Sequence, residues 1–345
     1  LLSQSGARVI NASWIDRCAY SNIDWLVFEE IKDNGTITVC GAGNSIAHCG
    51  SLDAEVFPAS YDNCISVTSV GHMNPIGYTD SIYGQTNWKD VHEAVIGDPG
   101  TAHHHNTAVD ICAPGYNVPS TSIGNTYQGT WGTSFASPQV AGICALILSV
   151  NPCLSRDEAV DILLSTAVDI DDIPENIAYN ELLGSGRADA FEAMKKAYGN
   201  SETIYSGETI VWNSFKSING TLLLQANSHL TINTRVYFNE NSNIVVKNGA
   251  SLVLESDGYL TSFCDKTWSV IIVEPGGIVE LRNESIVNIN GNGCIYVGKD
   301  TNYSSVLIFN QGAIINLVDN ESYIEIKGNL SIAANAQFTF TGAGY

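Results

Sequence analysis

A serine stands between a glycine turn and a long apolar run in residues 132–138, which read Gly-Thr-Ser-Phe-Ala-Ser-Pro. Gly132 permits close backbone approach, Pro138 fits a first helical turn, and the apolar run 140–148 predicts a buried helix. Such a helix would hold Ser134 at its N-terminus, where unpaired N–H groups and the helix dipole favour negative charge on an attacked carbonyl oxygen. The pattern predicts an acyl-transfer nucleophile; the alternative is a serine that only caps a core helix.

Strands and helices alternate in the first 200 residues around this serine. Short apolar runs bounded by turn residues predict strands near 7–13, 37–40, 65–70 and 109–115. Helices are expected near 22–33, 134–149 and 188–197, with a further one beginning at the capping-box pair Ser155 and Glu158. This alternation predicts an α/β fold, a parallel sheet with helices on both faces.

Several motifs in this region resemble those of the subtilisin-like serine peptidases, the subtilases. They are residues 6–14, 39–44, 57–61, 109–115, 132–138, 151–152 and 184–190. The resemblance covers roughly residues 1–198 and is specific, because several motifs occur in the family's order. It implies that Ser134 is the nucleophile and that the Asn44 side chain, with the Ser134 backbone N–H, forms the oxyanion hole. Such a donor contributes about 3 kcal/mol to transition-state stabilisation; the alternative for Asn44 is a plain turn residue.

The resemblance also implies a set of substrate contacts. The segment at Ser13 resembles an edge on which the peptide is laid as an added strand, which reads main chain and gives broad specificity. The implied substrate-binding residues are Ser13, Trp14, Cys40, Gly41, Ala42, Gly43 and Thr133. Trp14 stands where the family more often has a small or aliphatic residue, and its alternative interpretation is a packed aromatic.

The catalytic aspartate and histidine of the family have no counterpart in this sequence. Subtilases place Asp-Thr/Ser-Gly and then His-Gly-Thr before the serine, whereas none of the seven histidines here precedes a glycine. The nearest aspartate motif, Asp33-Asn34-Gly35, predicts a turn at a helix end. We therefore expect an N-terminally truncated peptidase domain whose Asp and His lie upstream of Leu1. Without a general base a serine hydroxyl is a poor nucleophile, so the 345 residues alone are expected to be nearly inactive.

Two features raise the question of a bound cation, although the chemistry of the family requires no cofactor. His103, His104 and His105 are consecutive, but adjacent side chains do not easily face one ion, so we favour a solvated insertion loop near the substrate cleft. The resemblance separately suggests a structural calcium or sodium ion. Its ligands would be backbone carbonyl groups of Ala59, Tyr61 and Cys64.

The formal net charge of −21 over 345 residues limits the partners. It argues against nucleic acid and anionic membranes as partners and favours a soluble, self-repelling protein. The resemblance to subtilases separately implies a peptide or protein substrate and a secreted or cell-surface location. No run approaches the roughly 20 apolar residues that span a bilayer, so membrane insertion is not expected.

The nine cysteines are an odd number, so at least one lacks an internal partner. Cys40, Cys112 and Cys144 lie in apolar motif strands or in the serine helix and are expected in the core. Cys49 and Cys64 bracket a loop and could form a disulfide in an oxidising compartment.

The residue pattern changes at a linker over 199–203, from alternating strands and helices to short strands separated by Asn, Gly and Ser. We therefore expect a peptidase domain at 1–198 and an all-β domain at 204–345. Short strands after Asn/Gly turns recur, for example at 248–252, 275–279 and 310–314. This repeat predicts a β-solenoid or β-helix, with a β-sandwich as the alternative.

The function expected for this second domain is spacing, surface attachment or carbohydrate contact. Its aromatic residues could stack on sugars, although core packing is the favoured interpretation; they are Tyr237, Phe238, Tyr259, Trp268 and Tyr296.

Two functions remain open for the whole chain. The leading one is a serine endopeptidase, and the alternative is a noncatalytic binding or adhesin scaffold with a degenerate peptidase domain.

Overall fold

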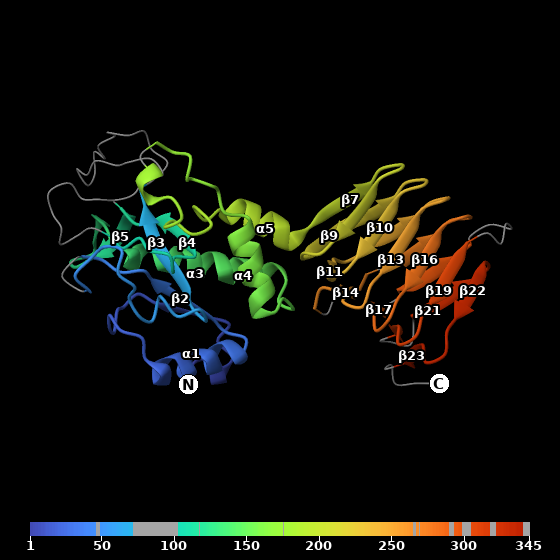
Figure 1. The fold of residues 1–345 in the computed structure, drawn as a ribbon, viewed down its shortest axis with the longest axis horizontal. Coiled ribbons are helices and arrows are strands. Elements are labelled where there is room, and N and C mark those ends of the chain that lie inside the picture. Colours follow the sequence, from blue (N-terminus) through green and yellow to red (C-terminus); the bar gives the residue numbers. More distant parts are fainter. Residues whose placement is uncertain are drawn as a thin grey trace. The chain divides into compact units, whose positions relative to one another are not determined.

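The computed structural model describes most of the chain as two compact units. The described residues are 1–45, 49–71, 103–116, 118–174, 176–264, 267–268, 270–289, 293–298, 305–317 and 322–340. The first unit comprises Leu1–Ser149 and Leu154–Met194, and the second comprises Val150–Cys153 and Lys195–Tyr345. Figure 1 shows that helices surround the strands of the first unit and that strands form the second.

The first unit is built on a parallel sheet in the order β1-β2-β3-β4, with strands Val9–Ala12, Ile37–Gly41, Ile65–Val70 and Ile111–Pro114. Every residue of β2 and β3 is buried, as expected for central strands covered on both faces. The predicted parallel α/β sheet is therefore confirmed.

Among the described residues four α-helices accompany this sheet, and local signals mark the starts of two of them. They are α1 (Asn22–Asp33), α3 (Thr133–Val150), α4 (Arg156–Ser165) and α5 (Ala190–Tyr198). Ser21 caps α1 by accepting the Asp24 N–H, and the predicted Ser155–Glu158 capping box begins α4. Short 3₁₀ helices cover Ser3–Ser5 and Ile177–Tyr179. A hairpin of β5 (Val118–Ser122) and β6 (Thr126–Thr130) was not predicted.

Helix α3 is the serine helix, and it is 18 residues long with a mean hydropathy of 1.5. By length and composition it is the one helix in the described ranges that could cross a membrane, so the expectation that no run is long enough was wrong. Val140, Cys144 and Ile147 on this helix are fully buried, which is the pattern of a core helix.

The second unit is a stack of parallel strands. Along one sheet, in the order β22-β19-β16-β13-β10-β8, His229 pairs with Ser251, Ser251 with Ile278 and Ile278 with Val306. The first residue of each of these strands thus pairs with the first residue of the strand in the next coil. All pairings in this unit are parallel within the described residues, which confirms a β-solenoid-like domain and rules against the antiparallel β-sandwich.

The strands of the second unit are short, and most bury alternate side chains toward the interior of the coil. They are β7 (Asn200–Ile204), β8 (Thr209–Trp212), β9 (Lys216–Leu224), β10 (His229–Ile232), β11 (Arg235–Phe238), β12 (Asn243–Val246), β13 (Ser251–Leu254), β14 (Tyr259–Ser262), β15 (Val270–Val273), β16 (Ile278–Leu281), β17 (Ile286–Ile289), β18 (Cys294–Val297), β19 (Val306–Phe309), β20 (Ile314–Leu317), β21 (Tyr323–Ile326), β22 (Asn329–Ile332) and β23 (Gln337–Phe340). Three of the candidate sugar-stacking aromatics, Tyr237, Phe238 and Trp268, are buried, so the core-packing interpretation is confirmed for them.

The cysteine pairing differs from the Cys49–Cys64 bond considered above. Cys49 is bonded to Cys18, and a second disulfide joins Cys153 to Cys264. Cys64 is a buried free thiol whose pKa is raised by the neighbouring Cys40 thiol and by burial. The placement of Cys40, Cys112 and Cys144 in the core is confirmed.

Burial also perturbs one carboxyl group of the first unit. Desolvation raises the pKa of Asp110 from 3.8 to about 6, even though the Ser66 N–H donates to its Oδ2 at 2.7 Å. A carboxyl whose pKa is higher in the folded state than in the unfolded chain opposes folding once the unfolded chain ionises. Below about pH 4 the protonated group costs the fold nothing. Stability is lost as the pH rises from about 4 through 6, and the loss reaches about 3 kcal/mol at pH 7.

We predict that Asp110→Asn matches the wild type in stability near pH 4 and exceeds it at pH 7, because the neutral amide avoids the buried charge. Urea unfolding between pH 4 and 7.5 measures the difference. Asp157→Asn, at a carboxylate that is 77% exposed, is the matched control and should follow the wild type. Parallel pH profiles for the wild type and Asp110→Asn would contradict the assignment.

Candidate functional site

The candidate site lies where β2 ends and α3 begins. Residues that follow β2 meet the first turn of α3 in a cleft of about 200 Å³. The cleft is lined by Ser13, Trp14, Ile15, Gly41, Asn44, Thr133 and Ser134. The structure therefore brings together the two main site residues predicted from sequence, Ser134 and Asn44, although 90 residues separate them.

Asn44 is held by Thr133 through two hydrogen bonds. Its Oδ1 accepts the Thr133 backbone N–H at 2.8 Å and the Thr133 hydroxyl at 3.2 Å. Because a backbone N–H can only donate, the atom facing Thr133 must be the amide oxygen, and the Nδ2 group of Asn44 is left as a donor. The Thr133 hydroxyl also accepts the Gly43 N–H at 3.1 Å, so it links the first turn of α3 to the segment that follows β2.

Two glycines make this close approach feasible. A Cβ on Gly41 would lie 2.9 Å from the Thr133 hydroxyl oxygen and 3.2 Å from the Thr133 backbone, so a larger residue would push α3 away. Gly132 precedes the helix with φ of +130°, a conformation that other residues rarely adopt. The glycine turn predicted before the serine is thus a geometric requirement of the site.

Ser134 lies in the first turn of α3, where a backbone N–H has no acceptor within the helix. Its hydroxyl donates to the Ser13 carbonyl oxygen at 3.4 Å, and the Ser13 hydroxyl donates to the Ser134 carbonyl oxygen at 3.0 Å. Within the described part of the chain, no histidine or carboxylate is hydrogen-bonded to Ser134 Oγ. The cleft therefore holds the Ser134 hydroxyl and the Asn44 amide together, and among the described residues no base is hydrogen-bonded to the serine.

The remaining predicted substrate residues divide into buried and exposed positions. Cys40, Gly41, Ala42 and Gly43 are buried, and of these Gly41 reaches the cleft. Trp14 is 53% exposed and lines the cleft, so the alternative interpretation, a packed aromatic, was wrong.

The three consecutive histidines are buried, which corrects the expectation of a solvated loop. His103 contacts the Ser69 hydroxyl, and a backbone bridge joins it to Asn44. The His104 ring lies between the carbonyl oxygens of Ala54 and Ser45, each at 3.1 Å. These contacts give the buried His103 and His104 rings hydrogen-bond partners within the protein. The rest of the expected insertion, residues 78–102, lies outside the described residues.

The histidine segment supports the backbone around Gly43 and Asn44, a structural role that sequence reasoning missed. The His104 backbone N–H donates to the Gly43 carbonyl oxygen at 2.9 Å, next to Asn44. Its only signal in the sequence was the run of three histidines itself. In the part of the chain that the structure describes, no group of three or more His, Cys, Asp or Glu side chains is placed to hold a metal ion.

The suggested backbone cation site lies in a buried turn. Ala59, Tyr61 and Cys64 are at most 4% exposed, and the Tyr61 carbonyl oxygen accepts the Cys64 N–H at 3.0 Å. One of the three carbonyl groups is thus already engaged within the turn, and a calcium or sodium ion there stays a prediction.

A parallel α/β sheet with a serine at a helix start beside an amide donor is an arrangement that one class of nucleophilic hydrolases uses. The family model described as "Peptidase_S8: Subtilase family" matches residues 1–203, and the chain belongs to this family. Subtilases are serine peptidases that need no cofactor for their chemistry, which supports that part of the sequence analysis.

Individual relatives agree with this assignment. Subtilisin DY of Bacillus licheniformis is 33% identical over 170 residues, which are 49% of this chain and 53% of that protein. The "Halolysin-like extracellular serine protease Nep" of Natrialba magadii is 35% identical over 136 residues, 39% of this chain and 20% of that protein. The chain therefore spans about half of Subtilisin DY and less of the halolysin-like protease.

The Thr133 hydroxyl gives a testable prediction for the site. Thr133→Val keeps the side-chain size but leaves the Gly43 N–H without its acceptor, at a position only 1% exposed. We expect a loss of about 1–3 kcal/mol in unfolding free energy and faster hydrogen exchange at Gly43. Thr133→Ser, which keeps the hydroxyl, should lose less, and Thr126→Val on exposed β6 is the control. A Thr133→Val protein with unchanged exchange at Gly43 would show that this bond does not hold the site.

Proposed function

We propose that this chain carries the nucleophile and oxyanion hole of a subtilisin-like serine endopeptidase that is secreted. The observation that supports the proposal most directly is the cleft in which Ser134 Oγ and the fixed amide of Asn44 lie together at the start of a buried helix. A serine that only capped α3 would need no second donor held beside it.

In the proposed reaction, Ser134 Oγ attacks a peptide carbonyl carbon while its proton passes to a general base. The carbonyl oxygen becomes an oxyanion that accepts hydrogen bonds from Asn44 Nδ2 and the Ser134 backbone N–H. The C–N bond then breaks, the base returns the proton to the leaving amine, and Ser134 is left as an ester. Water attacks this acyl-enzyme in the same way and releases the carboxylic acid.

The base is the part of the mechanism that the described residues do not supply. Ser134 Oγ donates to the Ser13 carbonyl oxygen, and a carbonyl oxygen cannot take up a proton at neutral pH. We assign the base to a histidine, oriented by an aspartate, in a segment upstream of these residues. On this proposal the 345 residues alone are nearly inactive.

The substrate would be an extended peptide or protein segment that pairs with the backbone near Ser13 and Trp14. Secretion is supported by the two disulfides, which form and persist in oxidising compartments, and by the extracellular protease among the relatives. We further propose a peptidase domain over 1–198 and an accessory domain over 204–345. The accessory domain would act by spacing, by surface attachment or by carbohydrate contact.

The proposal predicts the activity of four proteins on a fluorogenic peptide. A chain extended upstream to include the His and Asp should hydrolyse it, and Ser134→Ala in that chain should reduce the rate by at least ~10⁴-fold. Asn44→Ala should cost roughly 10²–10³-fold in kcat, because one oxyanion donor is lost. The 345-residue chain alone should give a rate close to that of the Ser134→Ala protein.

Two results would contradict the proposal. Robust hydrolysis by the 345-residue chain would show that a base lies within it. An extended chain that Ser134→Ala leaves unchanged, or that hydrolyses no peptide, would favour a noncatalytic binding scaffold.

A further inference from the structure

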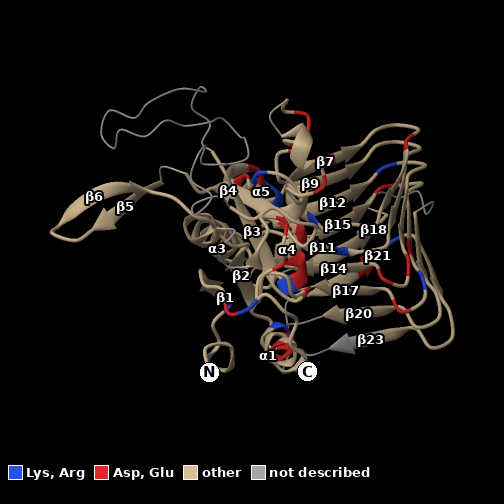
Figure 2. Ribbon diagram, turned by 60° about the vertical axis from the view of Figure 1, so that its left-hand side comes forward, with Lys and Arg blue, Asp and Glu red and all other residues tan. Residues whose placement is uncertain are grey.

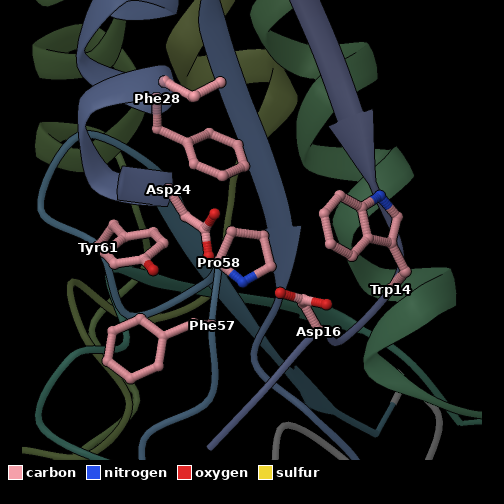
Figure 3. Close-up of a pocket in the computed structure, with 8 residues that line it drawn as sticks. Trp14, Asp16, Asp24, Phe28, Phe57, Pro58 and Tyr61 are labelled. Atoms are coloured by element: carbon pink, nitrogen blue, oxygen red, sulfur yellow. The ribbon is translucent and has the colours of Figure 1, made fainter. Parts of the chain in front are cut away.

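A second hollow, of about 370 Å³, adjoins the Ser134 cleft. Trp14 lines both the cleft and the hollow. Asp16, two residues further along the chain, lines the hollow alone. Its lining residues are Trp14, Asp16, Asp24, Val27, Phe28, Phe57, Pro58 and Tyr61. Figure 3 shows Trp14 facing Phe57 and Tyr61 across the hollow, with the carboxylates of Asp16 and Asp24 between them.

The walls of this hollow are fixed by contacts that do not involve a ligand. The Asp16 N–H donates to the Phe57 carbonyl oxygen at 2.9 Å, and the Phe57 N–H donates to the Arg17 carbonyl oxygen at 2.9 Å. The Phe57 and Tyr61 rings pack with centroids 4.6 Å apart, and both side chains are buried. The Tyr61 hydroxyl donates to the Ser21 carbonyl oxygen, which ties this wall to the start of α1.

The two carboxylates already bind one guanidinium group, that of Arg17. Arg17 Nε lies 2.7 Å from Asp16 Oδ2, and its Nη2 lies 3.1 Å from Asp24 Oδ2. Among the described residues, neither Oδ1 atom has a hydrogen-bond partner, and an ionised carboxylate offers acceptor sites on both oxygens. Two carboxylates and one guanidinium leave a net negative charge at the hollow, so a second cation can be accommodated.

We propose that this hollow binds a basic side chain, Lys or Arg, of the peptide that lies along Ser13 and Trp14. The inference rests on the proposed function and names the side-chain class that the site selects. The aliphatic stem of the basic residue would contact the rings, and its cationic end would reach Asp16 and Asp24.

Three physical terms favour a cation over an acidic or a neutral side chain. Aromatic faces attract a cation near the ring centre, and hydrogen bonds between a cation and a carboxylate are stronger than neutral ones. The surrounding charge acts in the same direction, because the chain carries a net charge of −21 and α1 carries acidic residues in addition to Asp24 (Figure 2). An acidic side chain would meet repulsion, and a neutral one would gain only apolar contact.

The test measures binding rather than hydrolysis, so that it does not depend on catalysis. The Ser134→Ala form of the 345-residue chain is titrated into labelled alanine-rich peptides that carry Lys, norleucine or Glu at each position in turn. Fluorescence anisotropy at low ionic strength gives Kd. At one position we expect Lys to bind about tenfold more tightly than norleucine, its uncharged counterpart, and Glu to bind more weakly.

Variants then assign this preference to the hollow. Asp24→Asn and, separately, Asp16→Asn should reduce the ratio of norleucine to Lys Kd toward one, whereas Arg17→Gln should increase it by removing the competing guanidinium. Asp157→Asn, an exposed carboxylate outside the hollow, is the matched control for net charge and should leave the ratio unchanged. Circular dichroism checks that each variant is folded.

The inference is overturned if norleucine binds as tightly as Lys at every position, if no peptide binds, or if Asp157→Asn lowers the ratio as much as the two hollow variants do. Its failure is separable from that of the proposed function. Hydrolysis by the extended chain without a preference for basic residues would leave the peptidase proposal intact, and a Lys preference in binding would stand even if hydrolysis were absent.

Discussion

The contact between the Asn44 amide oxygen and Thr133 is the constraint on which the site depends. A single oxygen atom accepts the backbone N–H and the hydroxyl of Thr133, so two hydrogen bonds join the segment that follows β2 to the start of α3. The same contact decides the orientation of the Asn44 amide and leaves Nδ2 as the donor. The absence of a side chain at Gly41 allows the contact, because a Cβ there would collide with Thr133. The chemistry of this region thus depends on packing between backbone segments.

The sequence could predict the elements with strong local signals. The bounds of α1, Asn22–Asp33, agree with the prediction because Ser21 caps one end and a turn at Asn34 closes the other. Ser134 and Asn44 could be placed together because their motifs carry family information. The fully buried strands β2 and β3 could also be predicted, because each is a short apolar run between turn residues.

Long-range contacts account for what the sequence could not predict. The burial of His104 depends on carbonyl oxygens of Ala54 and Ser45, which lie about 50 and 59 positions away and have no local signature. Cys49 pairs with Cys18 rather than Cys64, since connectivity follows the fold and not the spacing. The acidic aromatic hollow was missed for the same reason, as Asp16, Asp24 and Phe57 come from three separate segments. In the solenoid, the sequence predicted the short strands, but it did not predict which strands pair with each other.

The Cys153–Cys264 disulfide determines whether two fragments stay joined after a single cleavage of the backbone. Cys153 lies between α3 and α4, whereas Cys264 follows β14, so the bond encloses the whole stretch from α4 to β14, including residues 199–203. A protease that cleaved once within 199–203 would produce two polypeptides that remain one covalent molecule. The strands would still accompany the serine helix until a reductant opened the bond. The two pieces would migrate as one band without a thiol and as two bands with it.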